Sequence, residues 1–177
     1  MSEITILIDW LLNVISENLY LGVFLAALVE TIFPLIPSEL VYPLAGYTIL
    51  QTNLEPWHII TVGIVGGCGA TVGSTVFYFI SRYLGRVGIL RYGKRLGIKS
   101  SSIDKSDKWF AKYGDKSVLL GRLVPGIREL VSIPAGIFSM KFPKFLLYTL
   151  IGSISWSMIL TFLGYYFGVA TVDLFSI

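Results

Sequence analysis

The sequence predicts an all-α integral membrane protein with two inverted repeats, each a re-entrant helical hairpin followed by a transmembrane helix, plus amphipathic interfacial helices. Composition is the first reason: of 177 residues, 54% are hydrophobic and 14% are charged, whereas a soluble domain carries about a quarter charged residues. The mean hydropathy is +0.74. The second reason is the order of the apolar segments, in which a proline-broken segment twice precedes an unbroken one. We expect a single membrane domain over residues 1–177.

The N-terminal part predicts one helix at the membrane surface and one hairpin within the membrane. Residues 4–18 place polar side chains at three- and four-residue spacing, which is typical of an amphipathic helix in the interface. Residues 19–50 form the predicted first hairpin. Their first apolar arm ends after about 15 residues at Pro34, short of the roughly 20 that a span needs. Pro34 and Pro37 shape the predicted tip, because proline breaks a helix.

The middle of the chain predicts a membrane crossing and then a basic connection on the cytoplasmic side. Residues 57–84 are long enough to span, and their five glycines permit close helix packing. Residues 85–114 form the basic connection. Within it, Ile103–Tyr113 sets apolar and lysine side chains on opposite faces, which predicts an amphipathic helix at the cytoplasmic leaflet.

The last third repeats the order of the first two. Residues 116–140 are again two apolar arms around a charged middle, where Pro125 and Gly126 shape the predicted tip of a second hairpin. Residues 142–168 then cross the membrane. Both hairpins contain a proline followed closely by Ala-Gly, which supports a repeat. Because each repeat crosses once, the second copy must be inverted relative to the first.

The charge distribution predicts the topology. All fourteen Lys and Arg lie at or after Arg82, and ten of them lie between Arg82 and Lys116. The positive-inside rule places this connection in the cytoplasm, so both termini lie outside and the hairpin tips meet near mid-membrane. We therefore predict a multi-pass protein of the cytoplasmic (plasma) membrane. Anionic lipid headgroups are the expected partner of the Arg82–Lys116 cluster, and nucleic acid is not expected.

The two predicted tips carry the charged residues that we expect to act on a ligand. Glu30 and Glu39 belong to the first hairpin, and Arg122 and Arg128 belong to the second. Arginine binds a phosphate through two charge-assisted hydrogen bonds, so the arginines predict a phosphate site. A carboxylate in a low-dielectric setting can hold a proton near neutral pH, so the glutamates predict proton coupling. The alternative is a structural ion pair between the tips, but such a pair gains little over apolar residues.

Three other functions fit parts of the pattern. A membrane lipid phosphatase needs a nucleophile and a second histidine, or a metal. His58 is the only histidine and Cys68 the only cysteine, so we expect neither an enzyme nor a metal or other cofactor. A proton-coupled exporter of small ions would use the acids alone. A passive scramblase would stay active with Glu30 and Glu39 neutralised. The sequence leaves homo-oligomerisation open.

At these residues the sequence resembles the DedA family, also called SNARE-associated Golgi or VTT-domain proteins. The resemblance covers about residues 20–168, nearly the whole chain, and the arginine segment is its most specific part. The matching motifs are Glu30-x-x-x-Pro34-x-x-Pro37-Ser38-Glu39, Gly121-Arg122-Leu-Val-Pro125-Gly126-Ile-Arg128 and Ala135-Gly136-x-x-x-Met140.

The resemblance implies a lipid translocase or scramblase. Bacterial members are linked to recycling of undecaprenyl phosphate and some to phosphatidylethanolamine, and eukaryotic relatives scramble phospholipids. It places the functional acids at Glu30 and Glu39 and the functional arginines at Arg122 and Arg128. Glu129 departs from the family pattern, which has a small hydroxyl residue there, and an acid at this position is expected to weaken anion binding.

Residues and resemblance together predict proton-coupled translocation of a polyprenyl phosphate carrier, of the undecaprenyl or dolichyl type, across the cytoplasmic membrane. A single phosphate suits the paired arginines, and the tail can stay in lipid while the headgroup passes. The alternatives are a phosphatidylethanolamine flippase or scramblase and a proton-coupled exporter of small ions.

Overall fold

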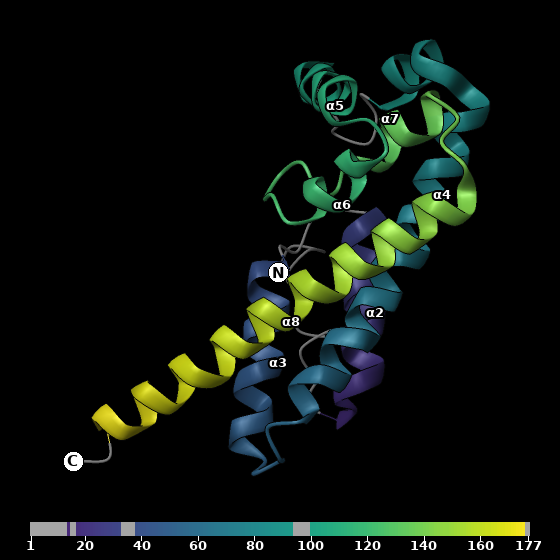
Figure 1. Cartoon of the computed structure of the whole chain (residues 1–177). Coiled ribbons are helices and arrows are strands. Elements are labelled where there is room, and N and C mark those ends of the chain that lie inside the picture. Colours follow the sequence, from purple (N-terminus) through teal and green to yellow (C-terminus); the bar gives the residue numbers. More distant parts are fainter. Residues whose placement is uncertain (1–13, 15–16, 33–37, 94–99, 176–177) are drawn as a thin grey trace, which may run out of the picture. The chain divides into compact units, whose positions relative to one another are not determined.

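The structure of the protein is a computed structural model that describes residues 14, 17–32, 38–93 and 100–175. These residues form helices joined by turns, with no strand among them (Figure 1), which confirms the all-α class. The predicted helix at residues 4–18 lies almost wholly outside the described residues. The helices are α2 (Leu19–Ile32), α3 (Ser38–Gln51), α4 (His58–Gly93), α5 (Ser100–Tyr113), α6 (Lys116–Arg122), α7 (Ser132–Ile137) and α8 (Phe142–Phe175).

Two stretches of helix are long and apolar enough to cross a membrane, His58–Ile89 in α4 and Phe142–Gly168 in α8. They lie where the sequence predicts its two crossings. α4 is interrupted at Gly85, whose φ of 62° is not helical. Glycine adopts a positive φ without steric cost, so the chain bends directly after the predicted end of the first crossing. The re-entrant character of the hairpins and the inverted repeat stay predictions.

The chain divides into two compact units. The first unit comprises residues 1–70 and 154–177, and the second comprises residues 71–153. The second unit holds all fourteen Lys and Arg with four Asp and Glu, a formal charge of +10. The first unit holds seven Asp and Glu and no Lys or Arg, a formal charge of −7. The division into units is therefore also a division of charge.

In the first unit, α3 packs against α2 on one side and against α8 on another. A Cβ atom on Gly46 would lie 2.1 Å from the carbonyl oxygen of Thr161, and one on Gly164 would lie 2.1 Å from the carbonyl oxygen of Pro43. The backbones of α3 and α8 thus touch where both residues are glycine. The buried cluster beside this crossing comprises Val23, Ala27, Tyr42, Ala45, Ile49, Ile59 and Val62.

We expect Gly164→Val to destabilise the protein by about 1–3 kcal/mol, because the added methyl groups would collide with backbone atoms that have no free rotamer. Thermal unfolding of the purified protein in detergent checks this through a lower Tm. The control is Leu163→Val on the exposed face of the same helix, which should change the Tm little. Equal melting temperatures for Gly164→Val and the control would show that α3 and α8 do not cross in backbone contact.

In the second unit, α5 contacts α6 and α7. Its apolar side chains are buried there: Ile103 packs with Ile89 and Ile133, and Phe110 packs in the cluster that contains Val118. The amphipathic pattern of α5 therefore serves the protein's own core. Only the lysine face of this helix is left to meet a membrane surface.

The segment predicted as the second hairpin consists of two short helices, α6 and α7, around a turn over residues 123–131. Pro125 and Gly126 lie in this turn, and Gly126 has a φ of 76°, which favours glycine. α7 lies against the backbone of α4, since a Cβ on Gly136 would be 2.3 Å from the carbonyl oxygen of Tyr78. Pro34 and Pro37, predicted to shape the first tip, lie outside the described residues.

Candidate functional site

Arg122 ends α6 and is 4% exposed. Its Nη2 donates a hydrogen bond of 2.6 Å to Oγ of Ser132, the first residue of α7, so the side chain joins the two short helices. Gly152 of α8 makes room for its stem, because a Cβ there would lie 2.6 Å from Cβ of Arg122. No described residue forms an ion pair with Arg122, and its buried Nε has no acceptor among them. A buried guanidinium without a close ion-pair partner is stabilised when an anion approaches it.

Arg128 lies in the turn between α6 and α7 and is 9% exposed. Its Nη2 lies 3.6 Å from Oε1 of Glu129, beyond the 2.7–2.9 Å that a direct charge-assisted hydrogen bond takes. Arg122 interacts electrostatically with both Arg128 and Glu129. The three side chains therefore form one charged cluster around the turn, in which two guanidinium groups repel each other. An anion between them would relieve that repulsion.

Glu30 lies in the last turn of α2 and is 3% exposed. Its Oε1 accepts a hydrogen bond of 2.8 Å from the backbone N–H of Ser38, the first residue of α3. The carboxylate thus satisfies one of the free N–H groups at the start of α3, where the helix dipole favours a negative charge. Glu30 therefore has a structural contact, which joins α2 to α3, besides the proton-coupling role predicted for it.

Glu39 follows directly and is exposed, unlike Glu30. Its Oε2 lies 3.4 Å from Oγ of Ser38, which donates a hydrogen bond to it. Nε1 of Trp156 in α8 lies 3.5 Å from the same Oγ and donates to it. Ser38 is therefore a common neighbour of both glutamates and of Trp156.

The structure places the four predicted site residues in two pairs. Arg122 and Arg128 flank one turn of the second unit, and Glu30 and Glu39 flank residues 33–37 of the first unit. The meeting of the two tips stays a prediction. Sequence reasoning gave no role to Ser38 or to Ser132. Each is a hydroxyl residue that lies near a charged candidate residue in an otherwise apolar segment, and this pattern was the signal that could have identified them.

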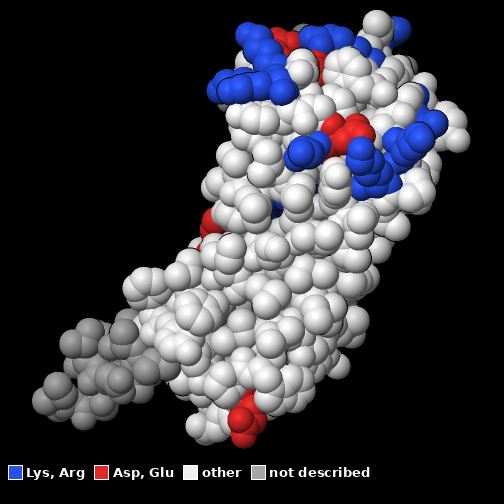
Figure 2. Space-filling view, viewed as in Figure 1, with Lys and Arg blue, Asp and Glu red and all other residues white. Residues whose placement is uncertain are grey.

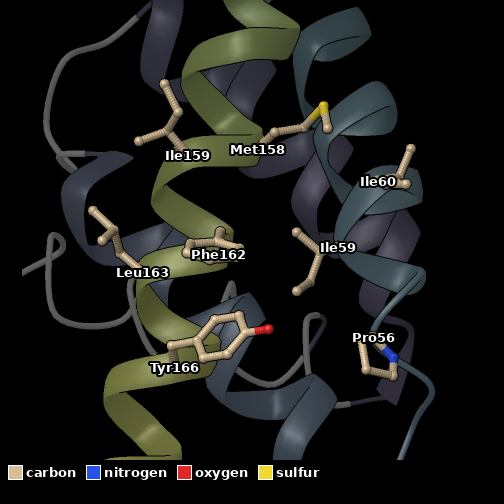
Figure 3. A pocket seen from close by; sticks show the side chains of 8 residues that line it. All are labelled: Pro56, Ile59, Ile60, Met158, Ile159, Phe162, Leu163 and Tyr166. Carbon is tan, nitrogen blue, oxygen red and sulfur yellow. The ribbon is translucent and has the colours of Figure 1, made fainter.

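An apolar groove of about 610 Å³ opens in the first unit between the start of α4 and the second half of α8. Figure 3 shows Ile59, Ile60 and Pro56 on one side and residues of α8, among them Phe162 and Tyr166, on the other. The Tyr166 hydroxyl is its main polar group, and none of the described residues that line it is charged. It is therefore unsuited to a charged headgroup, and its lining matches hydrocarbon.

The surroundings of His58, the single histidine of the sequence, are aromatic. Among the described residues, no three His, Cys, Asp or Glu lie together as a metal site. Nδ1 of His58 and the hydroxyl of Tyr20 share a hydrogen bond, and the His58 ring stacks on Trp57 with 3.8 Å between the centroids. The single histidine of the sequence is thus held in an aromatic cluster.

These features define a helical membrane protein with two buried arginines at a proline-containing turn. A family model supports this: the VTT domain matches residues 36–166. The chain belongs to the VTT-domain, or DedA, family, which confirms the resemblance seen in the sequence. No solved structure matches the chain significantly.

Three relatives illustrate what the chain is similar to. It is 36% identical to "Undecaprenyl phosphate transporter A" of Bacillus subtilis (strain 168) over 167 residues, 94% of this chain and 79% of that protein. It is 40% identical to "Uncharacterized membrane protein YkoX" of the same strain over 145 residues, 82% of this chain and 62% of that protein. It is 35% identical to "Alkaline phosphatase-like protein" of Lactococcus lactis subsp. cremoris (strain MG1363) over 159 residues, 87% of this chain and 73% of that protein.

Proposed function

We propose that the chain is a transporter that moves a polyprenyl phosphate lipid, of the undecaprenyl or dolichyl type, across the cytoplasmic membrane in a proton-coupled manner. The observation that carries this proposal is Arg122, a buried cation whose Nε has no acceptor among the described residues, next to the buried Arg128. The name of the Bacillus subtilis relative supports a phosphate lipid as the substrate and transport as the activity.

A phosphate group suits the buried guanidinium groups of Arg122 and Arg128. Its oxygens accept hydrogen bonds from guanidinium nitrogens in a planar, two-bond arrangement, and its negative charge compensates both cations. The hydrocarbon tail needs no protein site, because it can stay in the bilayer while the headgroup crosses. A charged headgroup crossing hydrocarbon alone would lose its hydration, and the arginines replace that hydration.

Glu39 and Glu30 are the proposed proton carriers. Glu39 is exposed and held only by the Ser38 hydroxyl among the contacts described above, so it is the acid that exchanges protons with the outside. Glu30 is buried in the last turn of α2 and contacts the start of α3 through the Ser38 N–H. Protonation of these acids from outside would accompany release or uptake of the phosphate by the arginines.

The basic connection between Arg82 and Lys116 is the proposed contact with anionic lipid headgroups. Lys105, Lys108 and Lys112 of α5 are exposed. On the face in Figure 2, Lys and Arg side chains gather over the part of the second unit that contains α5 and the adjoining end of α4. Each basic side chain near an anionic surface contributes on the order of 1 kcal/mol to attraction.

Transbilayer movement of a fluorescent polyprenyl phosphate in liposomes that hold the purified protein tests the proposal, with and without a pH gradient. Movement above that of empty liposomes and faster with the gradient supports it. Movement of phosphatidylethanolamine but not of the polyprenyl phosphate would show that phosphatidylethanolamine is the substrate. Movement of small ions alone would assign the protein to the ion exporters, and release of free phosphate from the probe would assign it to the phosphatases.

A further inference from the structure

Thr149 in the first half of α8 has a buried hydroxyl that makes no hydrogen bond to any described residue. The side chain is 0% exposed, and its Oγ1 has no partner in the part of the chain that the structure describes. A threonine in a helix can usually donate to the carbonyl four residues earlier. Thr31, Thr48 and Thr75 make that bond, at 2.8–2.9 Å. The Thr149 hydroxyl does not, so it keeps a donor available for a ligand.

This hydroxyl lies on the face of α8 that packs against α6. Phe145, four residues before Thr149, shares a buried cluster with Val118 of α6. Gly152, three residues after Thr149, lies against Arg122 at the end of α6, because a Cβ on the glycine would be 2.6 Å from Cβ of the arginine. Residues three and four apart share one face of a helix, so Thr149 lies between these two contacts. All five residues belong to the second unit.

Arg122 brings a second buried donor to the contact between α6 and α8. Its stem runs along Gly152, since its Cγ would lie 3.0 Å from a Cβ built there. The nitrogen nearest to that stem is Nε, which is buried and has no acceptor among the described residues, whereas Nη2 is bonded to Ser132 at 2.6 Å. A guanidinium can only donate hydrogen bonds. The Nε–H of Arg122 and the O–H of Thr149 can therefore both be satisfied by one acceptor from a ligand.

We propose that Thr149 is a further phosphate-binding residue, whose hydroxyl donates to the phosphate that Arg122 binds. This inference rests on the proposed function and adds to its site a residue from another element, the membrane-spanning helix α8. Phosphate oxygens are strong acceptors, and a phosphate has several of them, so the two donors can bind it together. The headgroup is then held by α6 on one side and by α8 on the other.

The same assignment predicts opposite effects of one substitution on binding and on stability. A buried hydroxyl without a partner destabilises the empty protein, because its hydration is lost and not replaced. Thr149→Val removes the hydroxyl and nearly keeps the shape of the side chain. The empty variant should therefore have a higher Tm than the wild type while it binds phosphate more weakly. A hydroxyl with a purely structural role would instead lower the Tm when it is removed.

Calorimetric titration of the full chain in detergent micelles with farnesyl phosphate, together with thermal unfolding of the empty protein, tests the proposal. We expect Thr149→Val to raise the Kd about tenfold, because one hydrogen bond to a charged group is lost. Thr149→Ser keeps the hydroxyl and should bind nearly as well as the wild type. Thr75→Val is the matched control: it removes a hydroxyl that already donates to the carbonyl of Thr71, and it should leave the Kd unchanged.

A wild type that binds farnesyl phosphate and a Thr149→Val variant with the same Kd would overturn the role of Thr149 and leave the proposed function standing. A lower Tm for the empty Thr149→Val variant would assign the hydroxyl a structural role and overturn the inference as well. No binding by the wild type would overturn the proposed function and, with it, this inference. Inorganic phosphate separates headgroup from tail: the same weakening by Thr149→Val supports a contact with the phosphate, and a weakening confined to farnesyl phosphate contradicts it.

Discussion

The Arg122→Ala variant should lose most polyprenyl phosphate transport. The truncation removes a buried guanidinium from the phosphate site, and one hydrogen bond to a charged group contributes about 1.5–3 kcal/mol. Since about 1.4 kcal/mol is a factor of ten, the rate or the apparent affinity should fall roughly ten- to hundredfold per lost bond. Initial rates of lipid movement in liposomes with equal amounts of protein measure the effect.

Arg122 also joins α6 to α7 through Ser132, so a loss of activity alone does not separate binding from stability. Arg122→Lys keeps the charge and most of the stem but loses the planar fork, and we expect it to fold and still transport poorly. Lys144→Ala removes an exposed positive charge of the same unit, one that pairs with Asp115 at 2.7 Å, and should transport normally. Normal transport by Arg122→Lys would show that only charge, and no bidentate contact, is needed at this position.

The two long helices were predictable from the sequence, because each has a strong local signal, and the candidate site residues were singled out by a signal of the same kind. Two apolar stretches of spanning length predicted α4 and α8, and charges in apolar segments marked Arg122 and Arg128. The orientation of α5 was not predictable in the same way. Ile103 and Phe110 form one apolar face of the helix. The same spacing of apolar residues is expected whether that face is buried in lipid or in the protein. The structure buries both in the protein.

Contacts that depend on turns were also beyond the sequence. Arg122 reaches Ser132 only because the turn over residues 123–131 returns α7 to α6, and no periodicity encodes that return. Glu30 satisfies the N-terminus of α3 from eight residues upstream, whereas the usual signal is a side chain of the capping residue itself. The position of Glu30 in an apolar segment suggested a functional role for this acid. It gave no indication that the carboxylate also contacts the start of α3.

Glu39→Gln should remove the response of transport to a pH gradient. The amide keeps the size of the side chain and an oxygen that can accept the Ser38 hydroxyl, but it cannot ionise. If one proton moves with each lipid, a gradient of one pH unit is worth about 1.36 kcal/mol and supports about a tenfold difference in lipid between the leaflets. The variant should leave the two leaflets equal, as measured by chemical quenching of the fluorescent lipid in the outer leaflet.

Glu30→Gln differs from Glu39→Gln in a way that tests the division of roles between the two acids. Glutamine at position 30 can still accept the Ser38 N–H, but without the charge that the start of α3 favours, which should lower stability by about 0.3–1 kcal/mol. Glu39 makes no such helix-end contact among those described, so Glu39→Gln should melt like the wild type. Glu55→Gln controls for the removal of an exposed acid. A tenfold leaflet difference that persists in Glu39→Gln would exclude this carboxylate as the coupling group. If the difference then vanished in Glu30→Gln, the buried acid at the start of α3 would carry the proton.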